Sequence, residues 1–327
     1  MSTTEPISFT CEQDEAWARI PGMDYDELLG EYLNPPEVIK TGIPMLDYHL
    51  AGGMTPGVYV IAAKPGGGKS ALALQIALNT ALAGRRALVV SAEMTVSQCA
   101  ARICSNLSYR PGLPGRDFKA FKWSDWEKMG ERGIEDGREA LRYLVERVPG
   151  LKVIDPADLG DGTLDALSPV LEDAAGAGTS LVVVDYLQRM PSAPDLAGDE
   201  FSRIGATSTY FMDAAKNLGL RILLITSTGR AARKGAGNLD SATAGMGSSS
   251  IEYDATACIG LSPEKQSNGE VLVSLTVDKA RRGITTGKGD SIDLRFMGAY
   301  NYFEPWARAI GWDEEIVPAQ EHGKDGE

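Results

Sequence analysis

Residues 58–70 read VYVIAAKPGGGKS, and this stretch decides the fold prediction. Its first six residues, 58–63, are mostly apolar and are typical of a buried strand. A glycine-rich loop follows, and a helix is predicted over 70–83, where Gly84 ends it. A strand, a glycine-rich loop and a helix in this order indicate a phosphate-binding loop within an α/β sheet.

The loop itself, AKPGGGKS, has the spacing of a Walker A motif in which Ala63 replaces the first glycine. Backbone N–H groups of such a loop, together with the start of the following helix, form a nest for a triphosphate. We predict that Lys69 reaches the β- and γ-phosphates and that Ser70 ligates Mg²⁺, so that the cofactors are ATP and Mg²⁺. The predicted nucleotide-binding residues are Ala63, Lys64, Pro65, Gly66, Gly67, Gly68, Lys69 and Ser70.

Strands and helices alternate on the C-terminal side of this motif. Strands are predicted at 85–91, 151–154, 180–185 and 220–226, and helices at 96–107, 123–147, 164–175 and 202–217. This alternation predicts an α/β fold with a mostly parallel sheet covered by helices on both faces. Three further strands, at 256–261, 271–278 and 291–296, are joined by turns and suggest an antiparallel C-terminal extension of that sheet.

Two carboxylates follow predicted strands and are candidates for the chemistry. Asp185 ends the apolar run 181–184, where a Walker B carboxylate that holds Mg²⁺ is expected. Glu93 follows the strand 85–91, and a carboxylate at that edge of the sheet can orient and deprotonate an attacking water. Spacing alone equally allows Glu93 to be a surface acid at the start of the next helix.

The composition limits the class of protein. The chain has 327 residues, 43% of them hydrophobic, and a net charge of −13 that is concentrated in residues 1–40 and 312–327. The intervening residues are close to neutral and can carry a local basic strip for nucleic acid. No apolar run is long enough for a membrane helix, no secretory pattern begins the chain, and we expect a cytoplasmic protein without a membrane partner. The spacing of the four cysteines matches neither a zinc ribbon nor a redox pair.

Three regions are predicted along the chain. Residues 1–40 form an acidic arm with a possible amphipathic linker helix at 23–33, residues 41–311 form the ATPase domain, and residues 312–327 form an acidic disordered tail. Within the domain, residues 229–250 are rich in Gly, Ala and Ser, and we predict a mobile loop there.

Five short motifs occur in the order typical of one family. They are Thr41-Gly42 with Leu46-Asp47, Pro56-Gly57, Glu93-Met94, the run DYLQ at 185–188, and the run IEYDA at 251–255. Through these motifs the chain, from Thr41 to about Trp306, resembles the C-terminal ATPase domain of DnaB-type replicative helicases, members of the RecA-like hexameric helicase superfamily 4. The resemblance implies a RecA-like P-loop core and the role of catalytic carboxylate for Glu93.

The resemblance also implies roles for basic residues that spacing alone does not assign. Lys279 and Arg281 match the family's Lys-x-Arg pair, so Arg281 would be an arginine finger in a neighbouring subunit's site, with Lys279 beside it. A homo-oligomer, a hexamer in the family, would then be required. The loop with Arg230, Arg233 and Lys234 matches the family's DNA-binding loop and would grip single-stranded DNA by its phosphates.

Two departures from the family pattern bear on these expectations. Residues 226–229, TSTG, stand where the family has a Gln that senses the γ-phosphate, and Ser227 and Thr228 are the candidates to replace it. Only about 40 residues precede the resembling region in this sequence, so we expect no N-terminal collar domain and carry over no primase binding.

The expected function is an ATP-dependent hexameric DNA helicase that translocates on single-stranded DNA during replication, with a helicase loader or replication initiator as a further possible partner. Two alternatives stay open. One is a DNA-binding recombination ATPase of the RecA or RadA kind that does not unwind DNA. The other is a ring ATPase of the KaiC kind that acts on protein partners, since fold alone does not fix function.

Overall fold

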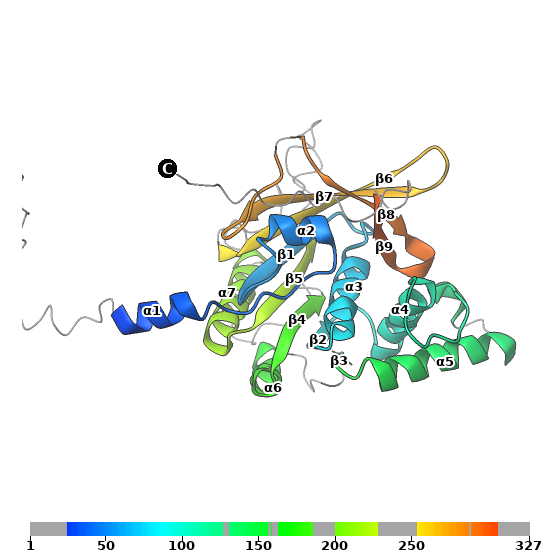
Figure 1. Cartoon of the computed structure of the whole chain (residues 1–327), viewed down its shortest axis with the longest axis horizontal. Coiled ribbons are helices and arrows are strands. Elements are labelled where there is room, and N and C mark those ends of the chain that lie inside the picture. Colours follow the sequence, from blue (N-terminus) through cyan, green and yellow to red (C-terminus); the bar gives the residue numbers. More distant parts are fainter. Residues whose placement is uncertain are drawn as a thin grey trace, which may run out of the picture. The chain divides into compact units, whose positions relative to one another are not determined.

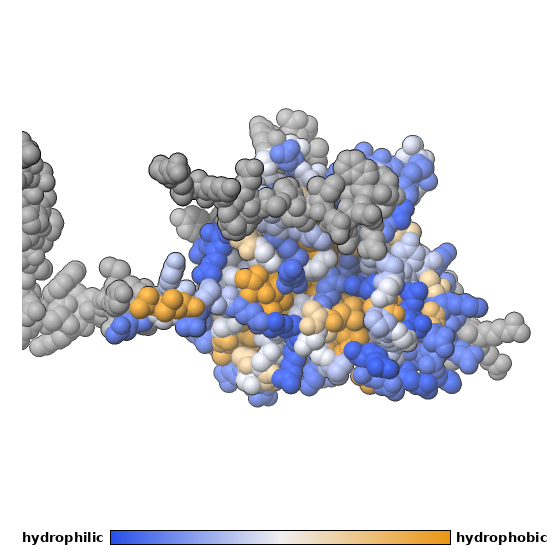
Figure 2. Space-filling view, in the orientation of Figure 1, coloured by the Kyte–Doolittle hydropathy of each residue, from blue (hydrophilic) through white to orange (hydrophobic). Residues whose placement is uncertain are grey.

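A computed structural model of the chain describes residues 25–126, 131–155, 158, 163–185, 200–227, 254–287 and 289–306. The chain divides into two compact units, Met1–Glu37 and Val38–Glu327. In the first unit, helix α1 (Tyr25–Leu33) lies within the range 23–33 where a helix was predicted, and it exposes Leu29, Tyr32 and Leu33. Figure 2 shows apolar residues along one side of this helix. The predicted tail at 312–327 and the predicted loop at 229–250 lie outside the described residues.

The second unit alternates helices and strands as the sequence predicts (Figure 1). Its helices are α2 (Pro44–His49), α3 (Lys69–Leu82), α4 (Val96–Tyr109), α5 (Glu131–Arg147), α6 (Leu164–Gly176) and α7 (Glu200–Leu218), with the short 3₁₀ turns η2 (Trp123–Asp125) and η5 (Gly298–Tyr300). Its strands are β1 (Gly57–Ala63), β2 (Arg86–Ser91), β3 (Leu151–Ile154), β4 (Thr179–Asp185), β5 (Arg221–Ser227), β6 (Ala257–Lys265), β7 (Val271–Ala280), β8 (Ile292–Met297) and β9 (Tyr302–Pro305).

Within the described residues, nine strands form one sheet in the order β3-β2-β4-β5-β1-β6-β7-β8-β9. Neighbours from β3 to β6 pair in parallel, and neighbours from β6 to β9 pair antiparallel. The prediction of a mostly parallel sheet with an antiparallel extension is therefore confirmed. It was wrong in one detail, because β6 itself pairs in parallel with β1, with Val60 opposite Cys258.

Alternating side chains of the parallel strands divide between two buried clusters. On one face, Tyr59 and Ile61 belong to the cluster that includes residues of α2, α3 and α4. On the other face, Val58 and Val60 belong to the cluster that includes residues of α6 and α7. Both faces of the central strands are thus covered by helices, which explains why their sequences are continuously apolar.

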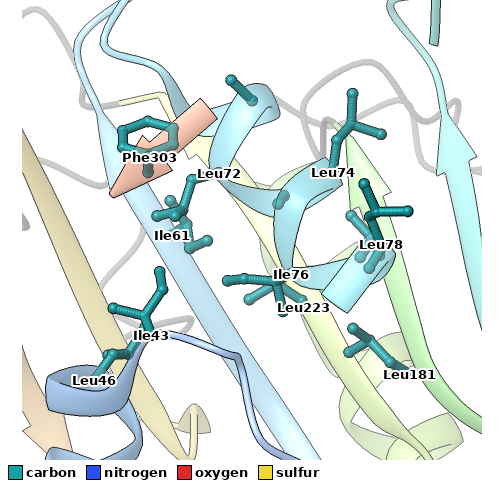
Figure 3. Packing of buried hydrophobic residues seen from close by; sticks show 14 of the residues in the cluster. Ile43, Leu46, Ile61, Leu72, Leu74, Ile76, Leu78, Leu181, Leu223 and Phe303 are labelled. Atoms are coloured by element: carbon teal, nitrogen blue, oxygen red, sulfur yellow. The ribbon is translucent and has the colours of Figure 1, made fainter. Parts of the chain in front are cut away.

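Helix α3 is the best-buried helix on the first face. Figure 3 shows Ile76 of α3 beside Leu223 of β5, and Phe303 of β9 near Leu72 and Ile61. Ile76 and Leu72 have no exposed surface, and burial of each such side chain stabilises the fold by about 1.5–3 kcal/mol. This packing fixes the start of α3, and hence the loop before it, against the sheet.

The order of the strands places three chain segments together at one edge of the sheet. Strands β2, β4, β5 and β1 run in parallel, so their carboxyl ends lie at the same edge. The glycine-rich loop follows β1, Glu93 follows β2, and Asp185 ends β4. Ligands bind at this edge in open α/β sheets, and the predicted site residues therefore converge there.

Candidate nucleotide-binding and catalytic site

The loop between β1 and α3 has a backbone that requires its glycines. Gly66 and Gly68 have φ values of 75° and 87°, in the left-handed region that favours glycine. A Cβ atom on Gly67 would lie 2.9 Å from the Cβ of Ala63 and 2.9 Å from the carbonyl oxygen of Lys64. Gly68 is also the N-cap of α3 and provides no capping side chain, so the first N–H groups of the helix remain available to an anion.

The antiparallel part of the sheet supports this loop. Phe296 of β8 and Phe303 of β9 stack with ring centroids 4.3 Å apart, and a Cβ on Gly68 would lie 3.0 Å from Phe303 Cζ. Gln75 of α3 holds the same strand through two hydrogen bonds: its Nε2 donates to the carbonyl oxygen of Phe303 at 2.8 Å, and its Oε1 accepts from the Phe303 N–H at 2.8 Å. These contacts fix the position of the glycine-rich loop.

A cavity of about 480 Å³ lies at this edge of the sheet. It brings together four residues that the sequence predicted for the site, namely Lys69, Ser70, Glu93 and Asp185, with the glycine-rich loop. Its lining is Pro65, Gly66, Gly67, Gly68, Lys69, Ser70, Ala71, Glu93, Met94, Arg102, Trp123, Asp185, Phe296, Gly298 and Asn301. Ala63 and Lys64 lie just before this lining, at the end of β1.

Asp185 carries a buried carboxylate that lacks a donor. Its side chain is 2% exposed, and neither carboxylate oxygen has a hydrogen-bond partner of standard geometry. Burial raises the pKa of Asp185, and the nearby Ser70 hydroxyl lowers it. A buried carboxylate beside a serine hydroxyl and a phosphate-binding loop fits the oxygen ligands that Mg²⁺ prefers.

Lys69 lies across the loop that precedes it. Its Nζ donates to the carbonyl oxygens of Ala63 and Lys64 at 3.2 and 3.1 Å. Burial lowers the pKa of Lys69, whereas the carboxylates of Asp185 and Glu93 raise it. The ammonium group is thus held at the mouth of the loop, within the electrostatic reach of both carboxylates.

A tight turn after β2 determines the position of Glu93. The Ser91 hydroxyl accepts a hydrogen bond from the N–H of Met94 at 3.0 Å and donates one to its carbonyl oxygen at 2.7 Å. The N–H of Ala92 donates to the carbonyl oxygen of Asp185, which ties this turn to β4. Helix α4 begins with a capping box at Thr95, so Glu93 lies before the helix and lines the cavity.

Arg102 and Trp123 also line the cavity, although sequence analysis missed both. Arg102 Nη1 donates to Asn301 Oδ1 at 3.1 Å, and its Cζ lies 4.3 Å from the Trp123 ring centroid. Trp123 Nε1 donates to the carbonyl oxygen of Gly298 at 3.1 Å. The signal for Arg102 was its place on the buried face of α4, three residues after Cys99, where a cation requires a partner.

Lys279 and Arg281 are not part of this cavity. Lys279 lies in β7 opposite Cys258, and the N–H of Arg281 donates to the carbonyl oxygen of Thr256 at 2.8 Å. The Arg281 side chain is exposed. The chain therefore does not bring the predicted finger to its own candidate nucleotide site.

Other predicted site residues are only partly described. Arg230, Arg233, Lys234 and Thr228 lie outside the described residues. Thr226 and Ser227 end β5, where they pair with Ala62 and Ala63 at the start of the glycine-rich loop. The position of the missing Gln is thus adjacent to that loop.

The chain is similar in sequence to replicative DNA helicases and to a DNA repair protein. The replicative DNA helicase DnaB of Pasteurella multocida (strain Pm70) is 26% identical over 271 residues, which are 81% of this chain and 55% of that protein. DnaB of Geobacillus stearothermophilus is 23% identical over 287 residues, which are 86% of this chain and 59% of that protein. The chain thus spans about half the length of the curated relatives it matches. The DNA repair protein RadA of Aquifex aeolicus is 30% identical over 183 residues, 56% of this chain and 35% of that protein.

Solved structures share the fold. The structure of a DnaB-like replicative helicase superposes with a TM-score of 0.68 at 17% identity, covering 86% of this chain and 67% of that protein. A KaiC-like protein of Pyrococcus horikoshii gives a TM-score of 0.52 at 16% identity, covering 83% of this chain and 99% of that protein. Every helix in the described part of the chain is too short or too polar to cross a membrane.

The family comparison covers the whole described second unit up to the end of β9. The model of the DnaB-like helicase C terminal domain matches residues 38–305, which include the glycine-rich loop, both site carboxylates and the Lys279–Arg281 segment. On this match, the chain belongs to the DnaB-like helicase C-terminal domain family.

Proposed function

We propose that this chain is a homohexameric, ATP-dependent DNA helicase that translocates on single-stranded DNA during replication, in the cytoplasm. The observation that carries the proposal is the cavity in which Lys69, Ser70, Glu93 and Asp185 meet while Arg281 lies elsewhere. Residues 41–311 would form the ATPase domain, with an acidic arm before it and an acidic tail after it.

Each residue of the cavity has a role in this proposal. The loop N–H groups and Lys69 bind the β- and γ-phosphates, and Ser70 and Asp185 hold Mg²⁺. When bound, Mg²⁺ neutralises charge that develops on the phosphate oxygens. Glu93, fixed by the Ser91 turn, orients the attacking water and accepts its proton.

Charge balance supports a contribution from a second subunit. Lys69 and Arg102 are the cations and Glu93 and Asp185 the carboxylates among the described residues that line the cavity, so their formal charges cancel. MgATP is a dianion and leaves the site negative. Lys279 and Arg281 from a neighbour would restore neutrality, and Arg281 would stabilise the transition state as an arginine finger.

DNA contact is assigned to the loop after β5. Arg230, Arg233 and Lys234 supply three cations to it, which suits sequence-independent contact with phosphates of one strand. Ser227 and Thr228, in place of the family's Gln, would report the state of the nucleotide to this loop. A helicase loader or replication initiator would bring the ring onto DNA.

The experiment that tests the proposal measures ATP hydrolysis with and without single-stranded DNA, together with displacement of a strand from a forked duplex. We expect single-stranded DNA to stimulate hydrolysis and ATP to drive displacement. Hydrolysis that is indifferent to DNA, by a protein that stays monomeric, would overturn the helicase proposal and leave only nucleotide binding.

A second candidate is a DNA-binding repair ATPase that does not unwind DNA. The similarity to RadA of Aquifex aeolicus, 30% identical over 56% of this chain, favours it. DNA-stimulated hydrolysis without strand displacement would select this candidate over the helicase.

A further inference from the structure

The turn at residues 281–284, which follows β7 and carries Arg281, lies on the end of helix α2. Strand β7 ends at Ala280, and the four residues of the turn come directly after it. Helix α2 lies against β7 (Figure 1) and ends at His49, a residue that has no role in the mechanism above. The contacts between His49 and this turn therefore bear on where Arg281 is held.

Two hydrogen bonds join His49 to the turn. The N–H of Ile284 donates to the carbonyl oxygen of His49 at 2.9 Å, and His49 Nδ1 lies 2.8 Å from the carbonyl oxygen of Ile284. Because a carbonyl oxygen only accepts, Nδ1 carries a proton and donates it to this bond. His49 thus pairs with both backbone groups of Ile284, as a residue of an antiparallel strand does, with its ring in place of the second backbone group.

Gly283 allows the turn to approach α2 this closely. A Cβ atom on Gly283 would lie 1.9 Å from the carbonyl oxygen of His49 and 3.1 Å from the Cα of Leu50. Both of these atoms belong to the backbone and cannot rotate away. Any side chain at position 283 would therefore push the turn off the end of α2.

Helix α2 is a fixed support for this contact. Leu46 has no exposed surface, and the carboxylate of Asp47 accepts hydrogen bonds from the N–H and hydroxyl of Thr41 at 2.6 and 2.7 Å. Asn79 Nδ2 donates in turn to the carbonyl oxygen of Thr41 at 2.7 Å. Since Asn79 belongs to α3, the helix that begins at Lys69, α2 is attached to the helix that forms the nucleotide loop's far side.

The backbone on either side of the turn is attached to the sheet. The N–H of Arg281 donates to the carbonyl oxygen of Thr256 at 2.8 Å. Beyond the turn, the N–H of Thr286 donates to the carbonyl oxygen of Val277 at 3.0 Å, and its hydroxyl accepts from the Val277 N–H at 3.1 Å. His49 adds the attachment between these two. Such support matters because a displacement of about 1 Å in a catalytic group can lower a rate by roughly 10²-fold.

We propose that His49 is a positioning residue for Arg281, and that its ring and carbonyl oxygen hold the turn at 281–284 where Arg281 reaches the nucleotide of a neighbouring subunit. This inference rests on the proposed function, because it takes Arg281 as a finger that acts on a second copy of the chain. His49 touches no nucleotide. It belongs to the half of the site that a subunit offers to its neighbour.

Steady-state ATP hydrolysis by the full chain, with single-stranded DNA present, tests the inference first. We expect His49→Ala to lower kcat by roughly 10- to 100-fold and to leave KM for ATP within about twofold, because a finger acts in the transition state. His49→Asn should restore kcat to within about threefold of wild type, since its Nδ2 takes the place of Nδ1 as donor. His49→Gln, whose amide lies one atom further out, is the matched control and should stay as low as His49→Ala.

A second variant covers the case in which His49→Ala fails to fold. Gly283→Ala leaves His49 in place but forces the turn away from α2, because the new Cβ meets the carbonyl oxygen of His49. It should show the same loss of kcat with the same KM. Wild-type kcat in Gly283→Ala or in His49→Ala would overturn the inference.

Mixed assemblies show which half of the site His49 serves, a property that a merely structural role would not have. In an equal mixture of His49→Ala and Glu93→Gln, some interfaces join the intact cavity of a His49→Ala subunit to the intact turn of a Glu93→Gln neighbour. About a quarter of the wild-type hydrolysis should therefore return. His49→Ala mixed with Arg281→Ala should show no recovery, because both substitutions damage the same half.

The outcomes separate this inference from the proposed function. If Arg281→Ala mixed with Glu93→Gln regains activity but His49→Ala mixed with Glu93→Gln does not, His49 does not act through Arg281 and the inference is overturned, while the proposed function stands. Recovery in the mixture of His49→Ala with Arg281→Ala overturns it as well. If Arg281→Ala mixed with Glu93→Gln fails to recover although light scattering shows intact assemblies, the finger acting between subunits is overturned, and this inference with it.

Discussion

Two pairs of basic residues differ in how the fold holds them. Lys69 and Arg102 lie inside the cavity, where loop carbonyl oxygens hold the first and Asn301 and Trp123 hold the second. Lys279 and Arg281 lie at the end of β7, outside the cavity, and the Arg281 side chain is exposed. The first pair is positioned by contacts within the cavity, whereas the second lies away from the cavity of its own subunit.

The difference teaches how an active site can be divided between subunits. The parallel strands bring together the residues that we propose to hold nucleotide and water, because their carboxyl ends meet at one edge. The antiparallel strands begin on the other side of β1 and carry the Lys279–Arg281 segment away from that edge. If Lys279 and Arg281 act on a nucleotide, as we propose, that nucleotide belongs to a second copy of the chain.

The largest expected effect follows removal of the cation that the loop holds. Lys69→Ala should abolish measurable nucleotide binding and hydrolysis, because the β- and γ-phosphates lose their charged donor. Calorimetric titration with Mg-ADP and Mg-AMP-PNP checks this, with unchanged secondary structure by circular dichroism as the control. Wild-type affinity in this variant would show that the cavity is not the nucleotide site.

The next effect separates binding from chemistry within the same cavity. Glu93→Gln keeps the size of the side chain but removes the base, so hydrolysis should fall by about 10²- to 10⁴-fold while AMP-PNP affinity stays within about twofold. Steady-state hydrolysis and titration on the same preparation measure both quantities. If this variant hydrolyses ATP at the wild-type rate, Glu93 is not the base and is instead a surface acid before α4.

A smaller effect is expected for the proposed DNA loop. Replacing Arg230, Arg233 and Lys234 together by Ala should leave hydrolysis without DNA unchanged and weaken single-stranded DNA binding. The slope of log affinity against log salt concentration should fall by about 2 for each subunit whose loop contacts the strand. Fluorescence anisotropy across a salt series measures that slope, and an unchanged slope would mean that other residues contact the DNA.

The smallest effect on nucleotide binding is expected for a substitution that lowers the stability of the fold. Asp47 is buried, and it accepts hydrogen bonds from the N–H and hydroxyl of Thr41 at 2.6 and 2.7 Å. Asp47→Ala would leave those donors unpaired and should lower the free energy of unfolding by about 2–4 kcal/mol, without changing nucleotide affinity below the unfolding temperature. Asp213→Ala, an exposed position on α7, is the matched control in thermal denaturation.

Sequence reasoning predicted the parts of the fold that have long, periodic or continuously apolar patterns. Strands β1, β2, β4 and β5 and helix α3 were expected because each is an apolar run bounded by glycine or polar residues. Strand β9 and helix α2 were missed, because elements of four and six residues carry too little periodicity. The parallel pairing of β6 was missed because it depends on which strand is its neighbour, a non-local property.

The residues of the candidate site also fall into a predicted group and a group that sequence reasoning missed. Lys69, Ser70, Glu93 and Asp185 belong to local motifs, and the structure brings them into one cavity as expected. Arg102, Trp123 and Asn301 come from segments far apart in the chain and meet only through packing of α4 against η2 and η5. No local motif marks this group, and the place of Arg102 on the buried face of α4 was its one sequence signal. The roles of Arg281 and of the DNA loop remain predictions from family resemblance.

One measurement tests most directly the claim that each site is shared between subunits. Arg281→Ala and Glu93→Gln, each nearly inactive alone, are mixed in equal amounts and allowed to assemble, and ATP hydrolysis is recorded with single-stranded DNA present. An interface between an Arg281→Ala subunit and the intact Arg281 of a Glu93→Gln neighbour has a complete site, so about a quarter of the wild-type activity should return. A mixture of Lys69→Ala with Glu93→Gln is the control, because both changes affect the same half-site and no interface can be complete. Recovery in the first mixture alone is the predicted result, and no recovery in either mixture, with assembly intact by light scattering, would contradict the account.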